Sequence, residues 1–187
     1  MPVIRVAGVD PALNNLGMVK GNLDLSTLKF TPTEVSLVST KPDNSKGVYK
    51  NEDDLRRARE LSTALIEFTE GVDMIFIEMP VGSQSARAMA SYGISVGVCA
   101  ALDEGKVILT SAKQGKFYLT GSYTASKASM IKHATEKYPN LGWLTNARKG
   151  ISASNEHIAD AIGSVLAGIN THKFKSTLLT LRTIWNL

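Results

Sequence analysis

The chain has 187 residues, of which 43% are hydrophobic and 20% are charged, and its formal net charge is +4 at pH 7. This length and composition suit one soluble globular domain and exclude a disordered or collagen-like chain. No apolar run reaches the roughly 18 residues of a membrane span, and we expect no secretory signal at the N-terminus, which soon meets an acid and has no small-residue cleavage site. The single cysteine, Cys99, excludes an internal disulfide and a cysteine-based zinc site, so we expect a cytoplasmic protein without membrane contact.

Basic residues are concentrated in the middle of the chain. Residues 105–150 carry eight lysines and arginines and one acid, Glu136, whereas residues 1–104 carry ten basic and fourteen acidic side chains. Such a segment suits either a solvated lysine-rich surface or a face that binds a polyanion such as nucleic acid.

The first part of the chain predicts a strand-rich start. Short β-branched and apolar runs predict strands, which we expect at residues 3–9, 17–21 and 34–40, with a turn over 23–32 and an exposed loop over 41–51. A helix should follow at 53–70, where apolar residues recur at three- and four-residue steps. A buried strand at 72–78 then ends before a proline.

The remaining chain predicts mainly helices. Residues 83–102 are rich in alanine, glycine and serine, and a helix of such small residues can lie close to a sheet or to another helix. After a short strand at 106–109 we expect helices at 122–138 and 154–170, separated by a loop at 139–150. Strands first, followed by strands that alternate with helices, predict an α/β fold around a mixed sheet.

Acidic residues end two of these strands and begin the last helix. Asp10 closes the first strand and Glu78 closes the strand at 72–78, and ligands of α/β proteins usually bind at the carboxyl ends of strands. His157 and Asp160 are three residues apart and share a helix face. If these segments meet, their carboxylates repel one another unless a hard divalent cation neutralises them. Two such ions can catalyse phosphodiester cleavage.

Each of these residues also has a simpler explanation. Asp10 precedes a proline and suits a turn, and Glu78 can pair with a lysine. Glu156 and His157 can be exposed residues of a first helical turn. The ordered set is more specific than any one member, because the elements that carry it have the required type and order.

Four motifs follow one another between residues 3 and 171, namely GVDPALNNLGMV, FIEMPVGSQSARAMASYGISVGVCAAL, KFYLTGSYTASKASM and HIADAIGSVLAG. Together they resemble the RuvC family of Holliday junction resolvases. The resemblance implies a ribonuclease H-like fold, a mixed five-stranded sheet flanked by helices. It also implies a nuclease domain over residues 1–171 and an extension over 172–187 that packs on the core or on a dimer partner.

The resemblance implies a metal-dependent, structure-selective endonuclease that cuts Holliday junctions, and other branched DNA such as flaps and forks, by two-metal-ion hydrolysis. The implied ligands of two Mg²⁺ ions, for which Mn²⁺ can substitute, are Asp10, Glu78, His157 and Asp160. Lys116 and Lys127, eleven residues apart as in the family, would complete the catalytic set by contacting DNA near the scissile phosphate. The further DNA contacts that we expect are Lys113, Lys132, Arg148 and Lys149.

The resemblance also implies a homodimer, formed through the small-residue helix at 83–102, although this helix can instead pack only on its own sheet. Bacterial relatives have an aromatic residue three positions after the second acid, where this chain has Val81. This departure, the loop at 41–52 and the tail at 172–187 resemble bacteriophage members of the family. The tail places Phe174, Leu178, Leu181 and Trp185 at helical spacing.

Two alternatives stay open from the sequence. One is a branched-DNA binding protein that keeps the fold but has a degenerate catalytic site. The other is a nucleotide-binding phosphotransferase of the actin and sugar-kinase type, which also begins with a strand that ends in aspartate. That fold needs two such domains and usually many more residues.

Overall fold

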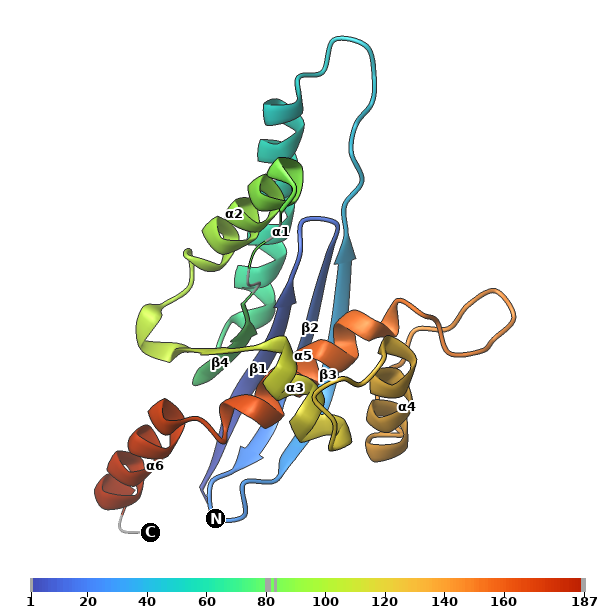
Figure 1. Ribbon diagram of the computed structural model, residues 1–187. Helices are drawn as coiled ribbons and strands as arrows, with labels where there is room; N and C mark the ends of the chain where they lie inside the picture. Colours follow the sequence, from blue (N-terminus) through green and yellow to red (C-terminus); the bar gives the residue numbers. More distant parts are fainter. Residues whose placement is uncertain (1, 80–81, 83, 186–187) are drawn as a thin grey trace.

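The computed structural model of the protein describes residues 2–79, 82 and 84–185 (Figure 1). Val81, which stands where bacterial relatives have an aromatic residue, lies outside the described residues. Five strands form one mixed sheet in the order β3-β2-β1-β4-β5. They are β1 (Val3–Pro11), β2 (Asn15–Asp24), β3 (Phe30–Ser39), β4 (Met74–Glu78) and β5 (Val107–Thr110). β2 pairs antiparallel with both β1 and β3, whereas β4 pairs in parallel with β1 and β5 in parallel with β4.

Helices cover both faces of this sheet (Figure 1). On one face α5 packs across the strands, with α3 and α4 against it, and on the other face lie α1 and α2. Their bounds are α1 (Lys50–Thr69), α2 (Ala86–Cys99), α3 (Ala112–Thr120), α4 (Lys127–Lys137), α5 (Asn155–Gly168) and α6 (His172–Trp185). A five-stranded mixed sheet flanked by helices is therefore confirmed.

Two hydrophobic clusters, one on each face, hold the layers together. The cluster under α5 contains Val6, Phe76 and Ile162, all fully buried, and the cluster under α1 contains Val9 and Leu65. Alternate residues of each central strand thus point to opposite faces, as the two-residue period of a strand requires. Phe174 and Leu178 of α6 are buried in the cluster under α5, whereas the side chains of Leu181 and Trp185 lie outside the described ones.

The predicted turn at 23–32 is too long, because β2 continues to Asp24 and β3 already begins at Phe30. The side chain of Asp24 accepts hydrogen bonds from the backbone N–H groups of Ser26 and Thr27, which closes a much tighter turn. The segment between β3 and α1 has no regular structure and protrudes from the body (Figure 1). No helix among the described residues has both the length and the apolar character that crossing a membrane requires.

Two helix predictions are also wrong in their bounds, and one helix was missed. The predicted helix at 122–138 begins only at Lys127, because Ser126 rather than Ser122 accepts the N-terminal hydrogen bond, from the N–H of Ser129. The missed helix α3 starts at a capping box of Ser111 and Gln114. The small-residue helix is shorter than 83–102 and spans Ala86–Cys99.

Candidate functional site

The sheet pairing places two carboxylates beside each other. In the parallel pair of β1 and β4, Val9 lies opposite Ile77, so that Asp10 and Glu78 follow at the same edge of the sheet. This edge is formed by the carboxyl ends of both strands, which is where α/β proteins commonly bind ligands. Asp10 is therefore part of a strand and of a polar cluster, and not only a turn residue before Pro11.

The N-terminal turn of α5 lies directly over this edge. A Cβ atom at Gly17 of β2 would be 2.4 Å from the carbonyl oxygen of His157, so only glycine allows the helix to come this close. His157 Nδ1 donates a hydrogen bond to Asp10 Oδ2 at 2.7 Å, and His157 Nε2 lies 3.4 Å from Glu156 Oε1. The His157 side chain is only 17% exposed, and the interpretation of Glu156 and His157 as exposed first-turn residues is therefore wrong.

Glu78 extends toward α3. A Cβ atom at Gly115 would lie 3.4 Å from Glu78 Oε2, so this carboxylate sits against the helix backbone where glycine leaves room. Burial raises the pKa of Glu78 to about 8, and the negative charges of Asp10 and Asp160 add to the rise, while Lys116 opposes it. No ion pair of Glu78 is found among the described residues, so the simpler explanation as a lysine partner gains no support.

The pKa values of Asp160 and His157 are also shifted by burial and by the neighbouring charges. Burial and the charge of Asp10 raise the pKa of Asp160 to about 6, against the opposing effects of His157 and Lys116. Burial alone would lower the pKa of His157, but the hydrogen bond with Asp10 and the neighbouring carboxylates raise it on balance. The predicted ligands thus gather at one place, where their negative charge is only partly compensated.

A divalent cation fits this place by its chemistry. Carboxylate oxygens are the ligands that Mg²⁺ prefers, and an imidazole can add a nitrogen ligand. As the side chains stand, no three histidine, cysteine, aspartate or glutamate residues within 2–79, 82 and 84–185 are close enough together to hold one ion. His157 is engaged with Asp10 in this arrangement, and the two side chains would have to reorient to share a cation.

Lysines flank the acidic residues. Lys127 Nζ donates to Glu156 Oε1 at 2.9 Å while its side chain remains 74% exposed, and this hydrogen bond raises the pKa of Lys127. Lys116 is half-buried on α3, and its charge acts on both Glu78 and Asp160. Both lysines are thus close enough to the acidic cluster for their charges to interact with Asp160.

The remaining predicted DNA contacts lie farther out. Lys113 is exposed on α3, and Lys132 lies 3.9 Å from Glu136 on the surface of α4. Arg148 and Lys149 are exposed on a hairpin-like loop closed by a bridge between residues 145 and 151. The side chain of Asn146 accepts the N–H groups of Arg148 and Gly150, which gives this basic tip a defined shape.

Sequence reasoning missed a buried arginine that supports the site. Arg57 of α1 is 1% exposed and donates to Thr40 Oγ1 at 2.9 Å and to the carbonyl oxygen of Leu13 at 3.1 Å. It also donates to Asn14 Oδ1, so it fixes the loop that follows Asp10. The available signal was its position four residues before Leu61 on the apolar face of the helix.

The mixed sheet and the helices on its two faces define an α/β protein with a ribonuclease H-like fold. Among solved structures, the chain is similar to Thermus thermophilus RuvC in complex with a Holliday junction substrate, with a TM-score of 0.61 and 21% identity over 95% of this chain and 97% of that chain. It is similar to Thermus thermophilus RuvC alone, with a TM-score of 0.58 and 21% identity over 95% and 98%. Fowlpox virus resolvase with Holliday junction DNA gives a TM-score of 0.50 and 16% identity over 95% and 99%.

These likenesses establish the fold of the chain. No family model matches the sequence, and no curated protein matches it. The order of strands and the nearly complete coverage of both chains show that the whole described core follows this fold, from β1 to the C-terminal helices.

Proposed function

We propose that this protein is a metal-dependent endonuclease that nicks four-way junctions and other branched DNA, including flaps and forks. The observation that carries the proposal is the cluster of Asp10, Glu78, His157 and Asp160 at the carboxyl edge of β1 and β4. Two solved structures of the same fold are, by their descriptions, complexes with Holliday junction DNA, which supports DNA as the ligand.

In this proposal the four clustered residues hold two Mg²⁺ ions, for which Mn²⁺ can substitute. When bound, such ions supply Lewis-acid stabilisation of the charge that develops at the phosphate. Asp10 contributes from the sheet, whereas His157 and Asp160 contribute from α5, so that the two layers of the fold are joined at the site. Glu78 and Asp160 are half-buried, so their carboxylates are partly shielded from water, which strengthens their attraction for a cation.

The lysines hold the DNA backbone. Lys116 and Lys127 stand beside the acids, where an ammonium group can neutralise a phosphate oxygen without reading sequence. Lys127 stays largely exposed while paired with Glu156, so a phosphate can reach it. Lys113, Lys132, Arg148 and Lys149 would grip the arms of the branch. Binding should weaken steeply as salt rises, because the release of counterions from DNA drives it.

We further propose a homodimer through α2. Its residues Ala86, Ala90, Gly93, Gly97 and Ala100 are exposed and recur at three- and four-residue steps. A Cβ atom at Gly93 or Gly97 would meet nothing within 4 Å, so another helix can approach this face closely. A two-fold dimer would present two equivalent sites, which suits symmetric cuts in a four-way junction.

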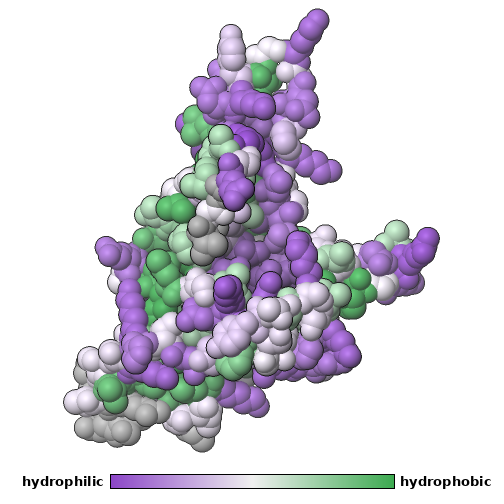
Figure 2. All heavy atoms as spheres, viewed as in Figure 1, coloured by the Kyte–Doolittle hydropathy of each residue, from purple (hydrophilic) through white to green (hydrophobic). Residues whose placement is uncertain are grey.

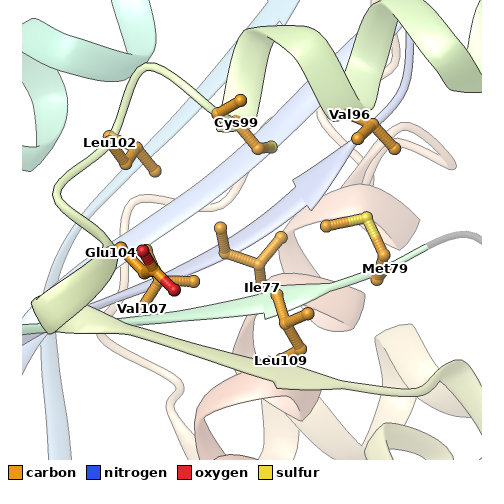
Figure 3. Close-up of a pocket in the computed structure, with 9 residues that line it drawn as sticks. Ile77, Met79, Val96, Cys99, Leu102, Glu104, Val107 and Leu109 are labelled. Atoms are coloured by element: carbon orange, nitrogen blue, oxygen red, sulfur yellow. The ribbon is translucent and has the colours of Figure 1, made fainter.

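An apolar pocket borders this helix and extends the proposed interface. It encloses about 300 Å³ between α2 and the edge of the sheet, and Figure 3 shows Ile77, Val96 and Leu109 among the side chains that line it. Figure 2 shows hydrophobic residues gathered on the same side of the molecule, next to α2. Burying this surface against a second copy would add apolar contact to the close approach of the helices.

The test is a nicking assay with the full-length protein. Labelled four-way junction, flap, fork and linear duplex are incubated with Mg²⁺ and, in parallel, with a chelator. We expect nicks in the branched substrates only when Mg²⁺ is present, and little cutting of the duplex. Binding to junctions with no nicking under any divalent metal would favour the alternative of a DNA-binding protein with a degenerate site. The cytoplasmic location and the bacteriophage-type origin stay predictions.

A further inference from the structure

Three aromatic rings, from residues that lie between the two site lysines in the sequence, form a cluster on the surface. Phe117 and Tyr123 are stacked, with ring centroids 4.5 Å apart and an interplanar angle of 12°. Tyr118 meets Phe117 edge-on at 5.4 Å. Phe117 is half-buried, whereas Tyr118 and Tyr123 are exposed, and Tyr123 is 55% exposed. A stacked pair that leaves so much of one ring in water has aromatic surface open for a further flat partner.

The loop that carries Tyr123 is held by its own hydrogen bonds. Helix α3 ends at Gly121, which adopts a left-handed φ of 79° and donates its N–H to the carbonyl oxygen of Phe117. The hydroxyl of Thr120 accepts the N–H of Ser122, and the hydroxyl of Ser122 accepts the N–H of Thr124. The ring pair is therefore presented by a shaped loop, and ordering it on binding would cost little entropy.

Along the chain, the cluster lies next to both lysines of the acidic site. Phe117 directly follows Lys116, whose charge acts on Glu78 and Asp160, and Lys127 pairs with Glu156 only four residues after Tyr123. Four residues span at most about 14 Å when fully extended. Since stacked nucleotides repeat every 3.4 Å or so along a strand, the rings lie within about four nucleotides of Lys127.

Positive charge beside exposed aromatic rings matches the chemistry of unpaired nucleotides. Lysines attract the phosphates, and an aromatic ring can stack on any base, because every base has a π face. In a paired duplex the base faces are covered by their neighbours, so only an unpaired or splayed base can use this surface. We propose that Phe117, Tyr118 and Tyr123 form a stacking platform for unpaired bases of a branched DNA next to the cleavage site.

This inference rests on the proposed function, because it names the part of the branched substrate that the protein holds. The competing explanation is that the ring pair only braces the loop between α3 and α4. A brace would affect folding and all DNA binding alike, whereas a platform would affect only substrates with unpaired bases.

The test measures equilibrium binding in a chelator, where no cutting can occur. The probes are a fork whose single-stranded arms carry 2-aminopurine and a fully paired duplex of the same length. Tyr123→Ala should weaken binding to the fork about 10-fold, within the range known for loss of one base–aromatic stack, and change duplex binding less than about two-fold. The 2-aminopurine fluorescence, quenched by stacking, should recover in the complex with this variant.

Two further variants and a control complete the design. Tyr123→Phe keeps the ring and should bind the fork like the wild type, whereas Tyr123→Leu keeps apolar volume without a ring and should lose fork binding. Tyr123→Leu replaces the alanine variant if thermal melting shows that the latter is unfolded. Tyr49→Ala removes a tyrosine that is 72% exposed, just before α1, and should change neither probe.

The inference is overturned if Tyr123→Ala and Tyr123→Leu bind the fork like the wild type, or if they lose fork and duplex binding equally. Failure of the proposed function gives a different result. In that case the wild type cuts no branched DNA with Mg²⁺, while the contrast between fork and duplex in the chelator persists and still supports the platform.

Discussion

Helices α5 and α2 cover opposite faces of the sheet and differ in how much of their surface is buried. Every residue of α5 from Ala161 to Gly168 is buried, while in α2 only Ser95, Val98 and Cys99 are buried. Both helices are rich in small and apolar residues, so composition alone does not separate them. The difference shows that α5 is a core helix whose N-terminal part carries the proposed ligands His157 and Asp160, whereas α2 keeps an apolar face that the described chain leaves uncovered.

The largest effect is expected from a change to Asp10, which lies on β1 and binds His157 at the N-terminal end of α5. Asp10→Asn should reduce cleavage of a four-way junction by roughly 100- to 1,000-fold, the scale of removing one electrostatic element of an active site. Junction binding should be kept or slightly strengthened, because the change removes negative charge that repels phosphate. Single-turnover nicking and gel-shift titration measure the two effects. A variant that nicks at the wild-type rate would refute the role of Asp10.

Arg57 tests whether the face under α1 also supports the site. Arg57→Leu should lower the free energy of unfolding by about 1–3 kcal/mol, because the hydroxyl of Thr40 loses its donor and the carbonyl oxygen of Leu13 keeps only the hydrogen bond from that hydroxyl. Cleavage should fall as well, since the loop after Asp10 loses its anchor. The matched control is Arg59→Leu, an exposed residue of the same helix, which should change stability by less than about 0.5 kcal/mol. Equal losses in both variants, measured by urea unfolding, would contradict this assignment.

The same glycine-to-alanine substitution in α5 and in α2 tests whether the first helix is enclosed and the second is open. Gly168→Ala in α5 would place a Cβ atom 1.9 Å from the ring of Phe76, and such overpacking should cost about 1–3 kcal/mol. Gly97→Ala in α2 meets nothing within 4 Å and should stabilise the helix by up to about 1 kcal/mol. Denaturant unfolding of both variants shows whether each change raises or lowers the free energy of unfolding. A loss of stability for Gly97→Ala would mean that a second copy already covers this face in solution.

The smallest effect on stability is expected at the rim of the apolar pocket. Val96 is half-exposed, so Val96→Glu should change the free energy of unfolding by less than about 0.5 kcal/mol while introducing a charge into the proposed dimer face. Sedimentation velocity should then show a monomer where the wild type is a dimer. Leu179→Glu on α6, also exposed, is the control and should leave the oligomeric state unchanged. A dimer that persists in Val96→Glu would exclude α2 as the interface.

The sequence predicted the strand-ending acids and helix α5 well, because both depend on local patterns. Asp10 and Glu78 follow apolar runs whose period identifies strands, and His157 and Asp160 share a face by helical spacing alone. It did not predict α3, which is short and whose capping box of Ser111 and Gln114 is a weak signal inside a lysine-rich segment. It also did not predict Arg57, because the acceptors of this side chain lie in two segments, around Leu13 and at Thr40, that are far from Arg57 in the chain.

By itself, then, the sequence determined the α/β class, the order of the elements other than α3 and the residues that we propose as metal ligands, because hydrophobic period and side-chain type are local properties. Only the tertiary structure decided that β1 and β4 are neighbours, that His157 faces Asp10, and that Phe117 stacks on Tyr123. It likewise decided that α5 is enclosed and α2 is not. These outcomes depend on contacts between segments far apart in the chain, where a missing side chain, as at Gly17, sets how closely two layers can approach.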